Sequence, residues 1–409
     1  MKIAILETIL MPAGHESEFD KILVDEIKAA GHEPVFFVPE SYKFKIDYDC
    51  SVYYLKHKAI SYANVSKFKK IFLSIKREIR KIFWLNEAFN LAKSGIVDAV
   101  LIPTCSYRML KSIGFTKFKN SSIPILLILH GIMPKDKAKF IALGKKLKKF
   151  TNIKFANLGL QEKFDELKNN DNFFTLTPPV YMPYLLNNTR ILNLDTLKFG
   201  FFGQYRKEKN LEFILESFCE AKFKQSVELI VQGSTPTKED ELDFKRLQDK
   251  YSKYENIKFI HKSLIGKEWQ EALMSVDVLL IPYGAKRYLY QPSAMLFTAI
   301  GFNKVVISSN FMSPEVINEF EIGEFANLNS VDEFSRQLEK FVNGFKNKKP
   351  VYQTALKNAN QKYSGANLIN QIIGILSKWK TQLFQMLSRI FWAKLFWIWK
   401  KMHKFALNH

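Results

Sequence analysis

Short, wholly apolar runs recur along the chain, separated by longer stretches in which apolar residues return at helical spacing. A run of this kind predicts a strand that is buried on both faces of a parallel sheet. The runs occupy residues 2–6, 35–38, 99–102, 125–129, 153–156 and 173–176, and then 198–202, 227–231, 257–260, 278–281 and 305–307. Because parallel strands need a crossover between them, the pattern predicts successive right-handed βαβ units.

The helical stretches between these strands fall into two consecutive series. We expect helices over residues 16–30, 64–93, 211–221, 244–254, 269–274, 294–300 and 352–376. The polar connection at 187–195 interrupts the alternation, which suggests a domain boundary there. The expected domains are residues 1–186 and 187–350, followed by a helix at 351–376 that closes or crosses back over them. The fold class is α/β, with two facing doubly wound parallel sheets and a ligand crevice between them.

Length and composition agree with two globular domains. The chain has 409 residues, of which 47% are hydrophobic and 25% charged, and this balance excludes wholesale disorder. Glu7 interrupts the apolar N-terminus, so a buried strand is favoured over a signal peptide. No apolar stretch reaches the roughly 18–20 residues that a spanning helix needs. Three widely spaced cysteines, Cys50, Cys105 and Cys219, indicate reduced thiols in a cytoplasmic protein.

The formal net charge of +21 is unevenly distributed. Two basic runs, at 67–81 and 135–149, contain one acidic residue each, and no acidic residue follows Glu339. Taken alone, the first run is the solvated face of an ordinary amphipathic helix. The segment 377–409 is cationic, aromatic and amphipathic, which favours a helix lying in a membrane interface over a core-packing helix. These features predict an anionic partner, either phospholipid or nucleic acid.

One strand–loop–helix–strand segment, residues 277–309, carries the clearest candidate ligand site. A loop follows the buried strand at 278–281, and Pro292 and Ser293 then begin a helix of small and apolar residues. Proline suits the first turn, where its missing N–H would be unpaired anyway. Open α/β sheets bind ligands at the carboxyl ends of their strands, and free N–H groups at a helix N-terminus suit phosphate. Residues 290–295 are therefore predicted to hold a diphosphate.

Two segments resemble the GT-B glycosyltransferases of family 4. Residues 202–215 contain a strand end, a glycine, a basic residue and Lys-Asn before a helix, and residues 276–308 look like the donor-site loop and helix of that family. In the first domain the resemblance rests on Gly14, the turn at 31–34, His130-Gly131 and Pro178-Pro179. The resemblance implies two facing Rossmann-like domains, a nucleotide-diphosphate sugar as donor, and transfer with retention of configuration.

The same resemblance implies a donor site in the second domain. Arg206 and Lys209 would clamp the diphosphate, the first through its guanidinium fork and the second as a point charge. Gly203 would permit close approach of the backbone. Further substrate contacts are expected at Gln232, Gly233, His261, Tyr283, Tyr290, Ser293, Ala294 and Thr298. An ordinary turn is the alternative at His261, and surface charge is the alternative at Arg206 and Lys209.

In the first domain, His130 ends a predicted strand and is followed by glycine. The resemblance places such a histidine against the donor sugar or the developing charge, so His130, Arg206 and Lys209 are the candidate catalytic residues. A hydrogen-bonded histidine at a sheet edge is the alternative. Gly14 would let the backbone approach the transferred phosphate and sugar, and His15 is a candidate contact for the acceptor.

The chain departs from the family pattern in its donor loop. Many members carry two glutamates eight positions apart, and Tyr290 and Thr298 occupy those positions here. Residues 293–294, Ser-Ala, instead resemble a subgroup with a small residue at the start of the helix. The missing carboxylates leave both retention and inversion open. The Asp-x-Asp triplet at 47–49 lies in an expected loop, outside the strand context of a metal-binding motif, so we expect no metal and no cofactor.

Together these features predict a glycosyltransferase that moves a sugar from a nucleotide-diphosphate donor to a membrane-borne glycan, such as a lipopolysaccharide, capsule or lipid-linked intermediate. The expected location is the inner face of the cell membrane, with the basic runs and the tail on anionic lipid. A nucleotide-sugar epimerase of the same fold would need acid–base groups near the donor sugar, and the missing glutamates argue against it. A basic nucleic-acid-binding protein is the non-enzymatic alternative. No recognition motif accompanies the lysines and aromatics, so no nucleic-acid partner is expected.

Overall fold

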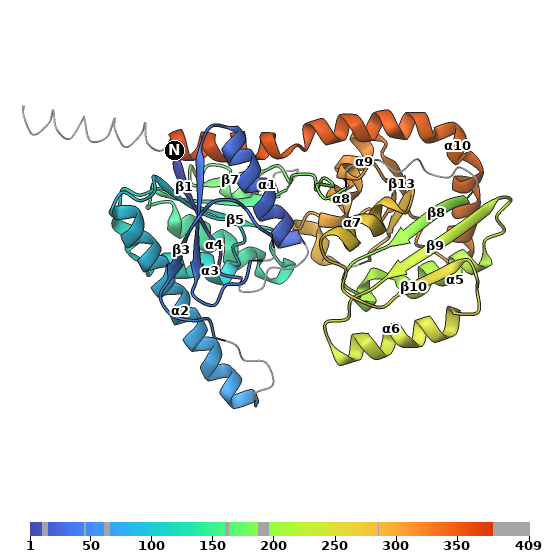
Figure 1. Cartoon of the computed structure of the whole chain (residues 1–409), viewed down its shortest axis with the longest axis horizontal. Helices are drawn as coiled ribbons and strands as arrows, with labels where there is room; N and C mark the ends of the chain where they lie inside the picture. The colour runs from blue at the N-terminus through green and yellow to red at the C-terminus, as the bar shows by residue number, and fades with distance from the viewer. Residues whose placement is uncertain are drawn as a thin grey trace, which may run out of the picture.

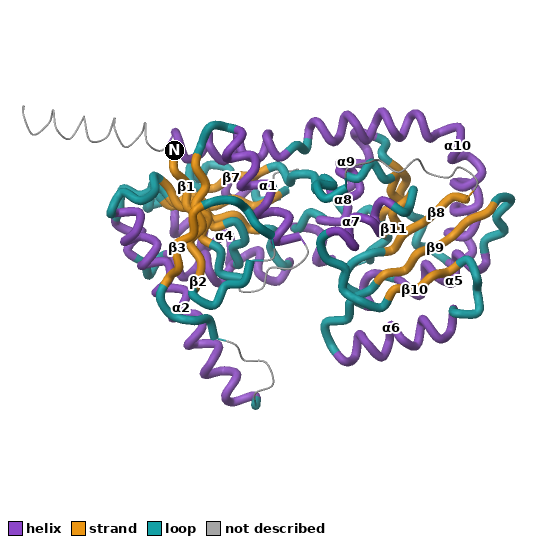
Figure 2. The backbone as a smooth tube through the Cα atoms, in the orientation of Figure 1, coloured by secondary structure: helices purple, strands orange, loops and turns teal. Residues whose placement is uncertain are grey.

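The computed structural model describes residues 1–9, 15–44, 46–60, 66–159, 163–186, 196–284 and 286–378. It contains two parallel sheets in two neighbouring domains (Figure 1). The strands of each sheet lie between helices (Figure 2). The α/β fold class predicted from alternating apolar and amphipathic segments is therefore confirmed.

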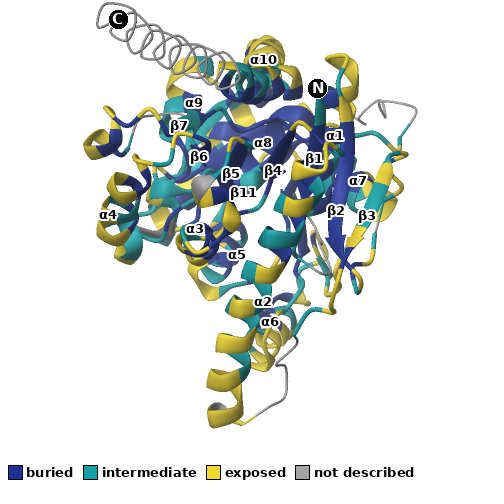
Figure 3. Cartoon of the chain, turned by 90° about the vertical axis from the view of Figure 1, so that its left-hand side faces the viewer, coloured by how far each residue is buried: buried dark blue, intermediate teal, exposed yellow. Residues whose placement is uncertain are grey.

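The first sheet has seven parallel strands in the order β3-β2-β1-β4-β5-β6-β7. Its domain contains β1 (Lys2–Leu6), α1 (His15–Ala29), β2 (Glu33–Pro39), β3 (Ser51–Leu55), α2 (Lys67–Lys93), β4 (Ala99–Ile102), α3 (Tyr107–Ile113), η1 (Lys117–Asn120), β5 (Ile125–Leu129), η2 (Pro134–Asp136), α4 (Lys137–Leu147), β6 (Ile153–Leu158), η3 (Asp165–Leu167) and β7 (Phe173–Leu176). Every residue of β4 and β5 is buried (Figure 3), as expected of strands covered on both faces. The strand order reverses between β1 and β4, which makes this position a topological switch point.

The second sheet has six parallel strands in the order β10-β9-β8-β11-β12-β13. Its domain contains β8 (Thr196–Phe201), η4 (Lys207–Lys209), α5 (Leu211–Glu220), β9 (Ser226–Gln232), α6 (Lys238–Tyr251), β10 (Ile257–Ile260), α7 (Lys267–Met274), β11 (Val278–Ile281), η5 (Lys286–Tyr290), α8 (Ala294–Gly301), β12 (Val305–Ser308), α9 (Pro314–Phe320), β13 (Gly323–Phe325) and α10 (Val331–Lys362). The order reverses between β8 and β11, so this sheet also has a switch point.

The C-terminal part of the chain contacts both domains. α10 packs on α5, α8 and α9 of the second domain, and residues 365–378 form a further helix that continues along the top of Figure 1. Gly365 lies so close to α1 that a Cβ there would be 2.8 Å from Ile22 Cγ2. Gln371 exchanges two hydrogen bonds with Thr177, at 3.1 and 2.9 Å. The chain thus returns to the first domain after completing the second.

Each apolar run forms the strand expected from it, with bounds that agree to within two residues. The elements β3, β13, α3 and α9 were not expected, because they are short and, for the edge strands, only partly buried. The helix α4 was not expected either, because residues 135–149 were recognised only as a basic run. α10 begins at Val331, well before the expected start, and α6 begins at Lys238 in a charged segment. The predicted boundary at 187–195 and the tail at 379–409 lie outside the described residues. Within the described ranges, no helix is both long and apolar enough to cross a bilayer.

Candidate functional site

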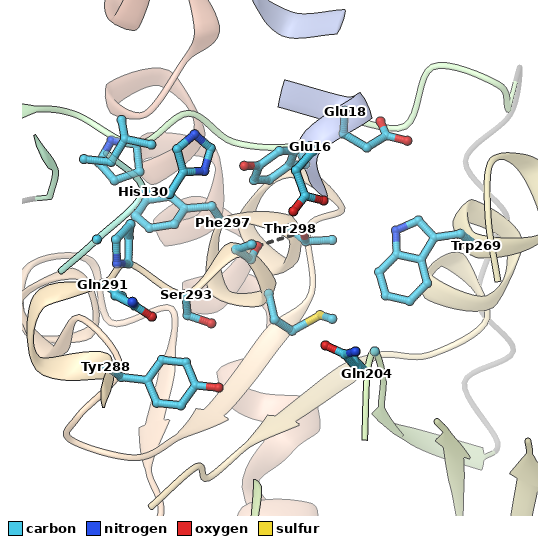
Figure 4. Close-up of a pocket in the computed structure, with 18 of the residues that line it drawn as sticks. Glu16, Glu18, His130, Gln204, Trp269, Tyr288, Gln291, Ser293, Phe297 and Thr298 are labelled. Atoms are coloured by element: carbon cyan, nitrogen blue, oxygen red, sulfur yellow. Dashed lines mark hydrogen bonds between the residues drawn. The ribbon is translucent and has the colours of Figure 1, made fainter. Parts of the chain in front are cut away.

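A cleft of about 820 Å³ lies between the two domains. The carboxyl ends of the central strands of both sheets contribute to its walls. Ile9 and Cys105 line it beyond β1 and β4, and Gly203 and Tyr283 line it beyond β8 and β11. Both switch points therefore open into one cavity, part of which is shown in Figure 4.

The turn after β8 brings a buried ammonium group to the cleft. Gly203 has a φ of +105°, which L side chains rarely adopt. A Cβ at Gly203 would lie 3.4 Å from Lys209 Nζ and 3.7 Å from Met295 Cε. Lys209 is 8% exposed, and its Nζ lies 4.9 Å from the ring centroid of Tyr283. The aromatic face stabilises the cation, and burial away from water favours an anion beside it.

Arg206 also lines the cleft but makes contacts within its own turn. Its Nη2 donates to Gln204 Oε1 at 2.9 Å, and its Nη1 lies 3.9 Å from Glu208 Oε1. An anion in the cleft would compete with these contacts for the guanidinium. Of the two predicted clamp residues, Lys209 is therefore the more buried, and Arg206 is the one that can exchange its present partners for an anion.

Gln232 links the turns that follow three neighbouring strands. It is 1% exposed and lines the cleft. Its Oε1 accepts a hydrogen bond from the Gly203 amide at 2.8 Å, and its Nε2 donates to the Lys262 carbonyl. A buried amide that is bonded at both ends fixes its neighbours. Gln232 thus positions the Gly203 turn from the side of β9 and β10.

The two other predicted nucleotide contacts beside Gln232 lie outside the cleft lining. A Cβ at Gly233 would lie 2.5 Å from the Phe244 ring, so this glycine accommodates the packing of α6. The exposed His261 ring lies 4.7 Å from the Phe244 ring between centroids. Ser263, which belongs to the predicted base and ribose segment that begins at His261, lines the cleft. Ser234, which the sequence did not single out, lines it as well.

The N-terminus of α8 forms another part of the cleft wall. Pro292, Ser293 and Ala294 line it, and Ser293 caps the helix by accepting a hydrogen bond from the Leu296 amide at 3.4 Å. Thr298 also lines the cleft, but its hydroxyl donates to the Ala294 carbonyl at 2.8 Å within the helix (Figure 4). The positive end of the helix dipole therefore lies at the cleft, where it favours negative charge.

Tyr290 lies outside the cleft lining because its loop docks on the first domain. Its ring centroid is 5.6 Å from that of Phe164, and Lys137 Nζ lies 5.2 Å from it. The Ile132 amide donates to the Tyr290 carbonyl at 3.3 Å. Tyr288, two residues earlier, lines the cleft (Figure 4). The structure thus uses Tyr290 in an interdomain contact.

This docking brings Gly131 against the same loop. Gly131 has a φ of +144°, and a Cβ there would lie 2.0 Å from Gln291 Cγ. Lys163 Nζ donates to the Leu289 carbonyl at 2.9 Å across the same boundary. Any side chain at position 131 would overlap Gln291, so close approach of the two domains requires glycine there.

His130 lines the cleft at the end of β5, as the sequence predicted (Figure 4). Its Nε2 lies 2.9 Å from the Pro103 carbonyl oxygen. Because a carbonyl only accepts hydrogen bonds, Nε2 carries a proton. The Phe19 ring meets the imidazole edge-on at 4.6 Å between centroids. Gly14 lies outside the described residues, and of His15 the structure describes only the backbone.

Two glutamates at the start of α1 line the cleft and were missed in the sequence. Figure 4 shows Glu16 and Glu18 on the helix opposite α8. Tyr184 donates to Glu18 Oε1 at 3.1 Å. Burial raises the pKa of Glu18 to about 7, although this hydrogen bond and Lys21 both act to lower it. Acidic residues are common in a first helical turn, so the pattern alone did not distinguish these two.

Two further carboxyl groups lie buried near these glutamates. Glu7 is 1% exposed and Asp20 is fully buried. Glu7 Oε1 accepts from the amides of Thr8 and Ile9, both at 2.6 Å. Neither oxygen of Asp20 has a hydrogen-bond partner among the described residues. Burial raises the pKa of Glu7 to about 8 and that of Asp20 well above its usual value, so the pair retains protons near neutral pH.

The Asp-x-Asp triplet forms a loop, as expected. The Asp49 amide donates to Asp47 Oδ1 at 3.0 Å, and Lys28 Nζ lies 3.4 Å from Asp49 Oδ2. Within the part of the chain that the structure describes, no three His, Cys, Asp or Glu residues gather to hold a metal ion. Transfer without a metal or cofactor stays a prediction.

Two parallel α/β domains that face each other across a cleft at both switch points define the GT-B architecture. Solved structures with this fold match 92% of the chain. They include a glycosyltransferase from Rickettsia africae ESF-5 (TM-score 0.63, 13% identity, 98% of that chain), Anabaena Alr3699/HepE in complex with UDP and glucose (0.66, 12%, 100%) and WaaG, a glycosyltransferase involved in lipopolysaccharide biosynthesis (0.59, 14%, 99%). The predicted GT-B fold is therefore confirmed. No protein-family model matches the sequence, and a search of curated proteins found no match.

Proposed function

We propose that the protein is a glycosyltransferase that moves a sugar from a nucleotide-diphosphate donor to a membrane-borne glycan. The observation that carries the donor assignment is that the Lys209 ammonium and the start of α8 line the same cleft, where Lys209 and the Met295 side chain both approach Gly203. A buried cation and a helix N-terminus together favour a diphosphate. Tyr283 supports the proposal, because its buried hydroxyl has no hydrogen-bond partner among the described residues and its side chain lines the cleft.

In this proposal the diphosphate lies between Lys209 and the N-terminus of α8. The nucleoside extends toward Ser234 and Ser263, and the sugar extends toward His130. Fixed N–H groups and an ammonium stabilise the charge that develops on the leaving diphosphate without reorganising. Arg206 adds a second cation when it exchanges its intraloop contacts for phosphate oxygens. Transfer with retention is part of the proposal, and NMR of the anomeric proton in the product tests it.

The membrane-borne acceptor is supported by charge and by what is known of similar folds. The net charge of +21 favours an anionic surface. HepE has been solved with UDP and glucose, and WaaG is a glycosyltransferase of lipopolysaccharide biosynthesis. For this protein we propose peripheral attachment at the inner face of the cell membrane, with a lipopolysaccharide, capsule or lipid-linked intermediate as acceptor.

Release of free nucleoside diphosphate from a panel of nucleotide sugars, in the presence of glycolipid acceptors, tests this function. We expect turnover of one or a few donors, and a loss of roughly 100-fold or more in Lys209→Ala. Lys207→Ala is the matched control, because Lys207 is exposed in the same turn. Inversion at the donor sugar's C2 without an acceptor would identify an epimerase. Tight, salt-sensitive RNA binding without donor turnover would identify a nucleic-acid-binding protein.

A further inference from the structure

The first half of α2 projects from the first domain, and much of it is exposed (Figures 1 and 3). It carries exposed apolar side chains. Six of them form what we call the apolar stripe: Phe68 (88% exposed), Ile71 (63%), Phe72 (66%), Ile75 (57%), Ile79 (49%) and Phe83 (56%). Residues at this spacing lie on one side of a helix. From first to last the stripe is about 22 Å long at the helical rise per residue.

The apolar stripe faces away from the protein's own core. Trp84, Leu85 and Ala88, further along the same helix, are buried, and Trp84 Nε1 donates to the Lys56 carbonyl at 3.1 Å. Because each helical residue turns by about 100°, Trp84 and Ala88 lie roughly opposite the stripe. One face of α2 packs on α3, η1, β3 and β4. An ordinary amphipathic helix would have only that one apolar face.

Cations accompany the apolar stripe. Glu78 is the single acidic residue between positions 67 and 81, and it is paired with Arg77 and Lys81 at 3.3 and 3.2 Å. Lys69 and Lys76 are exposed and lie seven residues apart, so both flank the same border of the stripe. Long cationic side chains beside an apolar stripe can reach lipid phosphates while the stripe enters the acyl region.

We propose that the apolar stripe of α2 inserts into the headgroup–acyl boundary of an anionic bilayer and fixes the first domain there. The excess of cations at the stripe selects an anionic lipid surface rather than a neutral apolar groove on another protein. The basic runs alone would hold the protein at the bilayer surface, whereas the stripe would also enter the bilayer. It does not depend on the donor site, because the stripe and the cleft share no residue.

Sedimentation of the full-length protein with phosphatidylcholine–phosphatidylglycerol vesicles tests the proposal. Phe68→Ser combined with Phe72→Ser should lower the partition coefficient by roughly 100-fold, because two large apolar groups no longer leave water. Val351→Ser is the matched control, since Val351 is 54% exposed on α10, which packs on the second domain. Both variants should keep the wild-type melting temperature, because the replaced side chains are exposed.

Several results would overturn the proposal. Failure of the wild type to sediment with these vesicles would do so, as would wild-type partitioning of the Phe68→Ser, Phe72→Ser variant. If that variant kept full vesicle binding and removal of residues 379–409 abolished it, the membrane contact would be assigned to the tail. If the double substitution changed the protein's mass in solution, measured by light scattering without vesicles, the stripe would be a self-association surface instead. Donor turnover is measured separately, so its failure would reject only the proposed function.

Discussion

At the scale of single residues, Arg206 and Lys209 show what a sequence pattern can and cannot predict. Both were expected at the diphosphate because of their spacing after a strand and a glycine, and both line the cleft. Their environments differ, since Lys209 is buried over Tyr283 and Arg206 bonds to Gln204 within its own turn. Burial and local pairing depend on neighbours from other strands, so the sequence could not distinguish the two.

The Glu7–Asp20 pair predicts a dependence of stability on pH. Burial raises the pKa of Glu7 from 4.5 to about 8, so the folded state holds protons that the unfolded state has already lost. The contribution of this pair to stability should therefore be fully present below pH 4.5 and should fall as the pH rises to about 8. Asp20→Asn removes one of the two titrating carboxyl groups and should flatten this fall, measured as the denaturant midpoint at each pH.

Asp25→Asn is the control for this measurement. Asp25 is exposed and pairs with Lys21 at 2.8 Å, so its replacement should leave the slope of stability against pH as in the wild type. Equal slopes in the wild type, Asp20→Asn and Asp25→Asn would contradict the assignment of raised pKa values to the buried pair.

At the scale of elements, wholly apolar strands were predictable and partly polar ones were not. Central strands such as β5 are buried at every position, so their composition alone indicates them. The edge strand β3, Ser51–Leu55, has a single buried residue, Leu55, so its sequence lacks the apolar run that indicates a central strand. α10 was predicted only after residue 352, because Pro350 lies inside it and a proline usually ends a helix.

Pro350 should destabilise the protein as it stands. Inside a helix, proline removes one backbone hydrogen bond and crowds the preceding turn, at a cost of about 3 kcal/mol relative to alanine. Part of this cost is offset because proline also restricts the unfolded chain. Since Pro350 is exposed, Pro350→Ala should raise the free energy of unfolding by about 1–2 kcal/mol. A decrease on denaturant titration would show that the proline is required for the path of α10.

At the scale of the whole molecule, the relative position of the two domains depends on contacts between distant parts of the sequence. The loop ending at Gln291 meets Gly131, and Tyr290 packs between Lys137 and Phe164. The sequence showed both segments as candidate ligand contacts, but it could not show that they touch each other. The cleft and its approximate walls were therefore predictable, whereas the docking of the donor loop was not.

Gly131→Ala should open this contact. A Cβ at position 131 would lie 2.0 Å from Gln291 Cγ, so the loop or the domain must move. Overpacking of this kind costs roughly 1–3 kcal/mol, which predicts roughly tenfold weaker nucleotide binding. Small-angle scattering should show a larger radius of gyration. Gly95→Ala is the control for a side chain at positive φ, because nothing lies within 4 Å of a Cβ there and its φ is +84°. Equal effects of the two substitutions would contradict the docking role.

The central claim is that Lys209 and the N-terminus of α8 bind the diphosphate of a nucleotide sugar. A thermal-shift measurement with a panel of nucleoside diphosphates tests it most directly, because a ligand at about 100 times its dissociation constant stabilises the folded state by roughly 2.7 kcal/mol. At least one nucleoside diphosphate should raise the melting temperature of the wild type and of Lys207→Ala. Arg206→Ala and Lys209→Ala should abolish the shift. A full shift in both of these variants, or no shift in the wild type with any member of the panel, would contradict the account.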